Sequence, residues 1–252
     1  MVRLRPRRLA LWLISGIVAV AVLAFGGAFV YIHFISGPAP APLSLKSGGS
    51  ASASNSASNS ASNSASGTAS TSAAARTSAL PGTWKVAAGS VVGYRVKEVL
   101  MGQNNIAVGR THSITGSLTI YGTKVTAARF TVQMATIKSD QSERDVQFNG
   151  RIMETSTYPA GTFRLTSPIE LTPVPAAGVV KVFHAAGDLT LHGHTRPVSF
   201  ALSAERTSAG LEVSGAIPVV FADYDIGNPS FGSFVSTGKS GTMEFLVKLG
   251  RS

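Results

Sequence analysis

The stretch GDLTLHGHTRPVSFAL, residues 187–202, decides the fold. Large apolar side chains recur at every second position before and after its central His192-Gly193 pair. Alternation with a period of two gives a β-strand one apolar face and one polar face. Gly193 supplies the backbone freedom for a tight turn, and Pro197 limits pairing at the start of the second run. The stretch therefore predicts strand, turn and strand, with an apolar face made of Leu189, Leu191, Val198, Phe200 and Leu202.

The amino-acid composition argues against cysteine-based sites and against nucleic-acid binding. The chain has 252 residues and no cysteine, which excludes disulfides and thiolate metal sites. Its formal net charge is +10, but all 12 acidic residues lie after residue 80, and residues 81–252 carry 16 basic residues, a net charge of +4. Those basic residues are scattered singly without interleaved aromatic residues, which argues against a nucleic-acid-binding surface.

The N-terminal region has the pattern of a membrane anchor. Residues 1–8 carry four arginines, whereas residues 9–35 carry no charge. A helix over residues 9–35 would be about 40 Å long, enough to cross a hydrocarbon core of about 30 Å. Trp12 and Tyr31 would then lie near the two interfaces, and the arginines would stay in the cytoplasm. The sequence predicts a cytoplasmic basic arm over 1–8, a signal-anchor helix over 9–35, and export of the remaining chain.

The alternative for this region is a cleaved signal peptide. The apolar run exceeds the roughly 7–15 residues that are usual for one. The best small-residue site, Ala39-Pro40-Ala41, is followed by Pro42, which is a poor residue after a cleavage site. The sequence therefore favours an uncleaved single-pass anchor.

Residues 36–80 form a region of different composition. They are rich in Ala, Ser, Asn and Pro, and residues 51–66 repeat Ala-Ser-Asn-Ser. Such a segment has too few large apolar side chains to offset the entropy of ordering, so the sequence predicts a disordered linker. A flexible coil of this length has a root-mean-square span of roughly 35–40 Å.

Residues 81–252 are long enough for one domain with a sizeable core. Short segments of period-two alternation recur along them, with Gly- and Pro-containing turns between them. This pattern predicts an all-β, antiparallel barrel or sandwich. Only residues 142–157 lack the alternation, and they predict a short helix or two turns that should end at Tyr158-Pro159. The expected strands are 90–97, 116–121, 128–137, 161–166, 179–183, 187–192, 198–205, 211–221 and 241–249.

Four sets of residues in this domain form a recognisable pattern when taken in order. They are Val91–Val96 with Gly116, Ser142-Glu143-Arg144-Asp145 with Tyr158–Phe163, Gly187–Gly193 with Thr195-Arg196-Pro197, and Phe221–Gly227. Together they resemble the YceI family, a lipocalin-like group of exported polyisoprenoid-binding proteins, and the resemblance covers residues 81–252 in family order. It implies an extended antiparallel lipocalin-like β-barrel of about eight strands around an elongated apolar cavity, with a short helix at one side.

Two departures from the family pattern stand out. The family often has a pair of histidines in its first hairpin, where this chain has Lys97 and a longer insert, Glu98–Gly109. His194 replaces the usual small apolar residue of the later hairpin. In these respects the chain resembles the membrane-tethered actinobacterial branch of the family.

Candidate catalytic and metal-binding residues have simpler structural interpretations. His192 and His194 could ligate a metal, but no carboxylate lies close in sequence. Asp223 and Asp225 could form a carboxylate pair, yet the following Gly-Asn-Pro indicates a turn. Arg144-Asp145 is interpreted as part of an ion pair that fixes the helix to the barrel rim. No nucleophile elbow occurs, so we expect neither an enzyme nor a cofactor.

The resemblance and the apolar strand faces together lead to the hypothesis of a carrier for a long isoprenoid lipid, either a polyprenyl phosphate or a quinone-like chain. Alternation alone selects the lining residues, and a basic residue at the mouth is expected to meet a lipid phosphate. The expected ligand-binding residues are Tyr94, Phe130, Val132, Met134, Phe163, Leu191, Phe200, Leu202 and Phe245, with Arg144 or Arg151 at the mouth.

Two other functions remain open on sequence grounds. A barrel with a solid core would suit an adhesion or signalling module, in which residues 98–110 bind a partner protein. An isoprenoid- or ester-processing enzyme would need a convergent polar triad inside the barrel, and these residues do not supply an obvious one. Two barrels could also pair as a homodimer.

Overall fold

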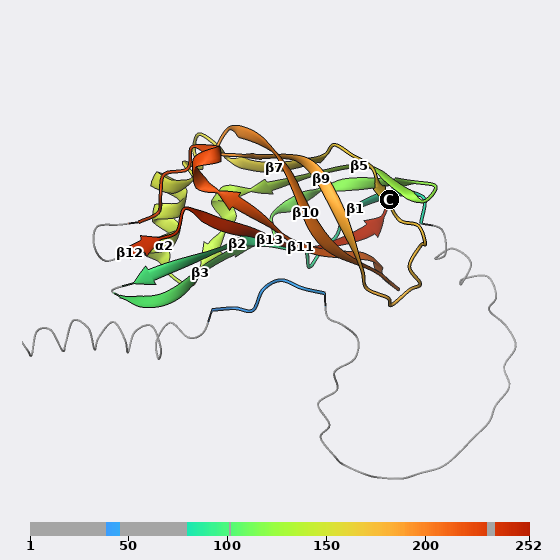
Figure 1. The fold of residues 1–252 in the computed structure, drawn as a ribbon, viewed down its shortest axis with the longest axis horizontal. Coiled ribbons are helices and arrows are strands. Elements are labelled where there is room, and N and C mark those ends of the chain that lie inside the picture. Colours follow the sequence, from blue (N-terminus) through green and yellow to red (C-terminus); the bar gives the residue numbers. More distant parts are fainter. Residues whose placement is uncertain (1–38, 46–79, 101, 231–234) are drawn as a thin grey trace, which may run out of the picture.

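The computed structural model describes residues 39–45, 80–100, 102–230 and 235–252 (Figure 1). The expected basic arm, the expected anchor helix over 9–35 and most of the expected linker lie outside these residues. Within the described ranges, no helix has the length and apolar character needed to cross a membrane.

The described part of the chain is an all-β domain whose strands are all antiparallel to their neighbours. Eight strands form a ring in the order β1-β4-β5-β7-β9-β10-β11-β13, and β13 pairs back with β1, so the predicted barrel of about eight strands is confirmed. The ring strands are β1 (Gly82–Val86), β4 (Ile114–Tyr121), β5 (Lys124–Gln133), β7 (Ala160–Leu165), β9 (Lys181–Leu191), β10 (His194–Thr207), β11 (Gly210–Val220) and β13 (Ser240–Arg251).

Two further strands lengthen the barrel at one end. β2 (Val91–Leu100) continues the line of β1 along β13, and β3 (Gln103–Thr111) continues the line of β4 along β2. The helix α2 (Ser142–Gln147) and the π-helical turn η4 (Phe148–Ile152) lie at this same end, as does β12 (Val235–Thr237) (Figure 1). The shorter elements are η3 (Met134–Thr136), β6 (Lys138–Ser139), β8 (Ile169–Glu170) and η5 (Phe221–Tyr224).

The hairpin predicted from residues 187–202 is confirmed. His192 and Gly193 both have positive φ angles, of 49° and 76°, as a two-residue turn of type I′ requires. Leu191 pairs with His194 across this turn, and the register continues to Lys181 and Ala204.

The segments 179–183 and 187–192, expected as separate strands, are parts of the single strand β9. Gly187, which suggested a break, makes no turn there. A Cβ atom at this position would lie 2.5 Å from the Phe163 ring, so the glycine makes room for an aromatic side chain.

The insert Glu98–Gly109 is not a loop. It is most of the β2–β3 hairpin, in which Leu100 pairs with Gln103 and Gly102 has a φ angle of 83°. The sequence pattern did not predict these strand residues, because the insert contains asparagines, which are depleted in strands in general. The expected helix is also shorter than its segment, because η4 ends at Ile152, well before Tyr158-Pro159.

Residues 39–45, assigned above to the linker, lie against the outer wall of the barrel. The Arg95 guanidinium donates to the carbonyl oxygen of Pro40 over 2.6 Å, and Arg110 donates to that of Ala41. The side chain of Leu45 is buried. The rest of the expected linker up to residue 79 is outside the described residues.

The turn at Gly193 gives a test of this packing. Gly193→Ala should destabilise the barrel twice over, because φ is positive and the new Cβ would lie 2.7 Å from Cε1 of Tyr158. Gly122→Ala is the matched control, since φ there is 57° and no atom lies within 4 Å of the new Cβ.

We expect a cost of about 1 kcal/mol for the control from strain alone, and about 1–3 kcal/mol more for Gly193→Ala from overpacking. Guanidinium denaturation of the two variants measures the difference. Equal costs would mean that the Tyr158 ring does not constrain the turn.

Candidate functional site

The interior of the barrel is hollow and contains two adjoining cavities. The inner cavity, of about 160 Å³, lies within the ring of eight strands. The mouth cavity, of about 540 Å³, lies between the β2–β3 extension, α2 and η4. Val92, Val132 and Met243 line both cavities, so the two are neighbours along the barrel.

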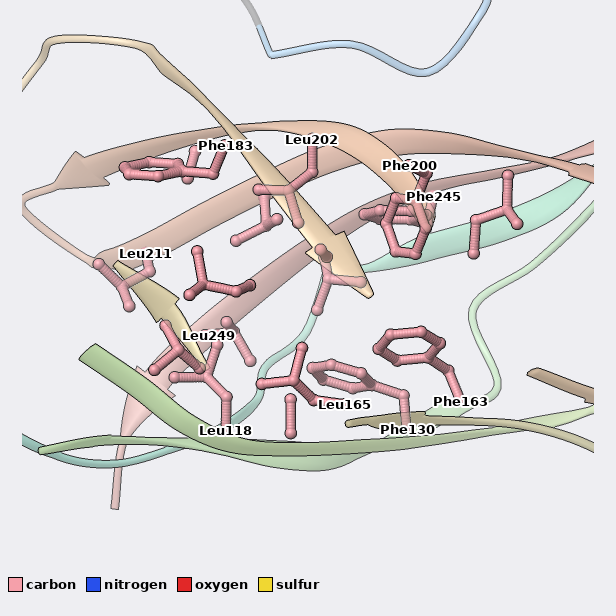
Figure 2. Close-up of a pocket in the computed structure, with 18 of the residues that line it drawn as sticks. Leu118, Phe130, Phe163, Leu165, Phe183, Phe200, Leu202, Leu211, Phe245 and Leu249 are labelled. Atoms are coloured by element: carbon pink, nitrogen blue, oxygen red, sulfur yellow. The ribbon is translucent and has the colours of Figure 1, made fainter. Parts of the chain in front are cut away.

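Aromatic rings from three strands form the centre of the inner cavity. Phe163, Phe200 and Phe245 point into the space between opposite walls (Figure 2). The Phe163 and Phe200 rings are 5.5 Å apart at 70°, and the Phe200 and Phe245 rings are 5.9 Å apart at 80°. Such edge-to-face contacts stabilise aromatic pairs beyond the area that they bury.

Glycines set the position of two of these rings. Gly215 is the register partner of Phe245, and a Cβ atom there would lie 2.5 Å from the Phe245 ring. Gly187 makes the same room for Phe163. The rings of Phe163 and Phe245 therefore each lie over the bare backbone of a neighbouring strand.

The mouth cavity has an aromatic wall of its own. The rings of Tyr94 from β2 and Phe148 from η4 stack, with centroids 5.1 Å apart and planes 17° from parallel. Met134, Ile137 and Leu191 add apolar surface, so the cavity continues the apolar lining outward. It reaches the surface beside the exposed side chains of Glu143, Gln147 and Arg151.

A buried ion pair lies at this mouth. The Arg144 Nη2 atom is 3.0 Å from Oε1 of Glu98, whose side chain is only 8% exposed. Arg144 also pairs with Asp140, and Asn105 donates to the same Glu98 oxygen over 2.7 Å. Burial opposes the charge of Arg144, but the carboxylates of Glu98 and Asp140 outweigh it and raise the pKa of the guanidinium.

Asp145 joins the helix to the barrel. Its Oδ1 atom accepts hydrogen bonds from the backbone N–H and the hydroxyl of Ser139, each over 2.8 Å, and its Oδ2 atom lies 3.6 Å from Nζ of Lys138. The expected ion-pair role of Arg144-Asp145 is thus divided. Asp145 fixes α2 to β6, while Arg144 fixes it to β2.

The phenol of Tyr94 remains neutral in this setting. Burial raises its pKa to about 12, and the carboxylates of Asp145 and Glu98 act in the same direction, against the opposing effect of Arg144. At neutral pH the mouth therefore presents a hydroxyl group beside the Glu98–Arg144 pair.

The structure places every residue expected to bind the ligand on one of the two cavities. Phe130, Phe163, Phe200, Leu202 and Phe245 line the inner cavity. Tyr94, Met134, Leu191, Arg144 and Arg151 line the mouth cavity, and Val132 lines both.

Sequence analysis missed other lining residues. Glu98 has the same strand parity as Tyr94 and Val96, so alternation alone could have placed it inside. Phe148 lies in a helical turn, where period-two alternation gives no signal.

The histidine and aspartate candidates lie in turns. His192 Nδ1 is 3.2 Å from the carbonyl oxygen of Tyr224, and its ring packs against Tyr158 with centroids 4.4 Å apart. Asp225 has a φ angle of 53° and caps η5. Among the described residues, no group of three or more His, Asp and Glu side chains could hold a metal ion.

Comparison with known proteins agrees with this architecture. A polyisoprenoid-binding domain from Saccharophagus degradans, implicated in plant cell wall breakdown, superposes with a TM-score of 0.55 at 17% identity, covering 68% of this chain and 99% of that one. The BcnA protein of Burkholderia cenocepacia gives a TM-score of 0.49 at 20% identity, covering 64% and 98%. No curated protein matches the sequence significantly. The model of the YceI-like domain matches residues 84–249, and the chain therefore belongs to the YceI family.

Proposed function

We propose that this protein is a non-enzymatic carrier that holds a long isoprenoid lipid inside its barrel, on the outer side of the plasma membrane. The observation that carries the proposal is the pair of neighbouring, mostly apolar cavities inside the barrel, the second of which has charged side chains at its rim. Protein interiors are normally close-packed, so apolar cavities of this kind are suited to an apolar chain. The family and the polyisoprenoid-binding domain of similar fold support the same ligand class.

Burial of the chain provides the driving force. Removing about 400 Å² of isoprenoid surface from water yields a gross free energy of about 10 kcal/mol. Ordering the chain and losing its translational freedom consume part of that gain. Phenylalanine and methionine side chains line both cavities and can adapt to an unsaturated, branched chain.

The charges at the mouth favour an uncharged head group over a phosphate. The charged residues that line the mouth cavity are Glu98, Glu143, Arg144 and Arg151, whose formal charges sum to zero. Arg144 is already held by Glu98 and Asp140. A phosphate that recruited Arg144 would leave the buried Glu98 carboxylate without its cation, which is strongly unfavourable. The near-parallel Tyr94–Phe148 stack offers a planar head group, such as a quinone ring, an aromatic surface.

A membrane tether would keep the barrel beside the bilayer that holds its ligand. A helix over residues 9–35 would keep the domain at the bilayer, where isoprenoid lipids reside, and the four arginines of residues 1–8 would orient it outward. Sequestering the chain in the barrel would let the lipid leave the bilayer without exposing its apolar surface to water.

Binding assays on the full-length chain in detergent test this proposal. A polyprenyl quinone should bind at least about tenfold more tightly than a polyprenyl monophosphate of equal chain length. Glu98→Gln should remove the buried carboxylate that a bound phosphate would leave without its cation, and so strengthen phosphate binding about tenfold, with little effect on the quinone. Asp188→Asn is the control, because it removes a carboxylate from the Arg164–Asp188 pair, whose residues line neither cavity.

Failure of both lipids to bind would contradict the carrier function itself. Tighter binding of the phosphate to the native chain would contradict only the choice of head group.

The raised pKa of Tyr94 predicts a pH dependence of stability. Between pH 10 and about 12 the unfolded phenol ionises while the folded one stays protonated, so the free energy of unfolding falls by up to about 2.7 kcal/mol. Tyr94→Phe should remove this part of the alkaline loss. Tyr121→Phe should not, because Tyr121 is 80% exposed. Denaturation at pH 9 and pH 11.5 compares the variants, and identical losses in all three proteins would refute the burial of the phenol.

A further inference from the structure

The outer wall of the barrel carries a cluster of charges that faces away from both cavities. Glu244 lies on β13 between Met243 and Phe245, which both point inward. An outward carboxylate is normally exposed, yet Glu244 is only 4% exposed. It pairs with Arg95 from β2, and Arg110 Nη2 from β3 lies 3.7 Å from its Oε2 atom.

The register explains how these three side chains meet. Gly93 pairs with Glu244 on one side and with Arg110 on the other. A Cβ atom at Gly93 would lie 1.9 Å from the carbonyl oxygen of Gly109, so the glycine lets β2 and β3 approach closely beside the cluster. Arg95, two residues further along β2, reaches the same carboxylate from the side.

The apolar part of the cluster is Val108, the register partner of Arg95. Its neighbour Ala107 lines the mouth cavity, so Val108 points outward, and nevertheless it is only 6% exposed. Leu45 is also buried, and neither side chain belongs to the barrel core. We define Arg95, Val108, Arg110 and Glu244 as the pad.

Residues 39–45 contact this pad through the two arginines. Each pad arginine donates to one of two consecutive carbonyl groups, those of Pro40 and Ala41. Pro40 and Pro42 lack an N–H group and favour an extended chain, so little entropy is lost on docking. Leu43 is half-buried, Ser44 exposed and Leu45 buried, the alternation of an extended segment on a surface.

We propose that residues 39–45 are a clamp, and that the pad is the binding site for this segment of the same chain. Arg95 lies nearer than Gly93 to the β2–β3 hairpin, so the direction from Pro40 to Ala41 leads away from the mouth cavity. The N-terminal end of the clamp, at residue 39, therefore lies on the side of the mouth.

Docking of the clamp shortens the free chain between the predicted anchor and the barrel. If the anchor ends at residue 35, three residues separate it from the clamp, a span of at most about 10 Å. Without docking, the separation would be the roughly 35–40 Å coil of residues 36–80. The clamp thus holds the mouth toward the bilayer, a consequence that rests on the proposed carrier function, whereas the docking itself does not.

Spin labelling of the full-length chain tests the docking, and the absence of cysteine makes the labelling specific. We expect a nitroxide at Ser44→Cys to show a slow component in its electron paramagnetic resonance spectrum. Val108→Glu should mobilise it by placing a charge under the clamp. Ile106→Glu is the matched control, because Ile106 lies on the same outer face of β3 and is 38% exposed.

Leu45→Asp gives the same test from the clamp itself and leaves the barrel sequence untouched, should Val108→Glu fail to fold. A label at Ser44 that is equally mobile in the native chain and in Leu45→Asp would overturn the proposal.

Pulsed distance measurements identify the occupant of the pad. Labels at Ser44→Cys and Lys97→Cys should give one narrow distribution that survives dilution with unlabelled chain. A narrow distribution that dilution abolishes would mean that a second copy fills the pad, which would overturn docking within one chain.

Orientation is tested in nanodiscs that contain paramagnetic lipid. The electron spin of a label at Asn104→Cys, in the mouth hairpin, should relax faster near the paramagnetic lipid than that of a label at Ala209→Cys, in the turn at the opposite end. Leu45→Asp should abolish this difference in spin relaxation. Equal relaxation in the native chain, with the Ser44 label still immobile, would refute the orientation and leave the docking intact.

Discussion

Strand β13 pairs with β11 along one edge and with β1 and β2 along the other. The ring therefore has no free edge, and every inward side chain faces an enclosed space. The inward positions are mostly apolar, so the inner cavity has an apolar lining. Gly187 and Gly215 let the rings of Phe163 and Phe245 lie close to the backbone of neighbouring strands.

An empty apolar space is a cost to the folded chain, since the lining loses the contacts that close packing would provide. A bound apolar chain restores those contacts. In the proposed carrier, the same feature would supply the binding free energy for a lipid. At the mouth, Glu98 and Arg144 already neutralise each other, so a ligand that broke this pair would be disfavoured.

Much of this could be predicted from period-two alternation. Leu189, Leu191 and Phe200 face inward as expected, because a strand in a closed wall has only two faces. Alternation did not predict the structure correctly where the residue types pointed to a loop or a turn. The strand β3 was not predicted because it contains asparagines. Gly187 suggested a turn, whereas it makes room for the ring of Phe163 within a continuous strand. The position of residues 39–45 could not be predicted, because it depends on Arg95 and Arg110, which are remote in sequence and meet only in the folded sheet.

Native mass spectrometry of the purified full-length chain, released from detergent in the gas phase, tests the central claim most directly. A barrel that carries an isoprenoid lipid should retain an additional mass that is lost on denaturation and is recovered by organic extraction as a polyprenyl compound. Phe200→Asp, which places a charge at the centre of the inner cavity, should lack that mass while keeping its β-sheet circular dichroism. A native chain that shows only its own mass, and that takes up neither an added polyprenyl quinone nor an added polyprenyl phosphate, would contradict the account.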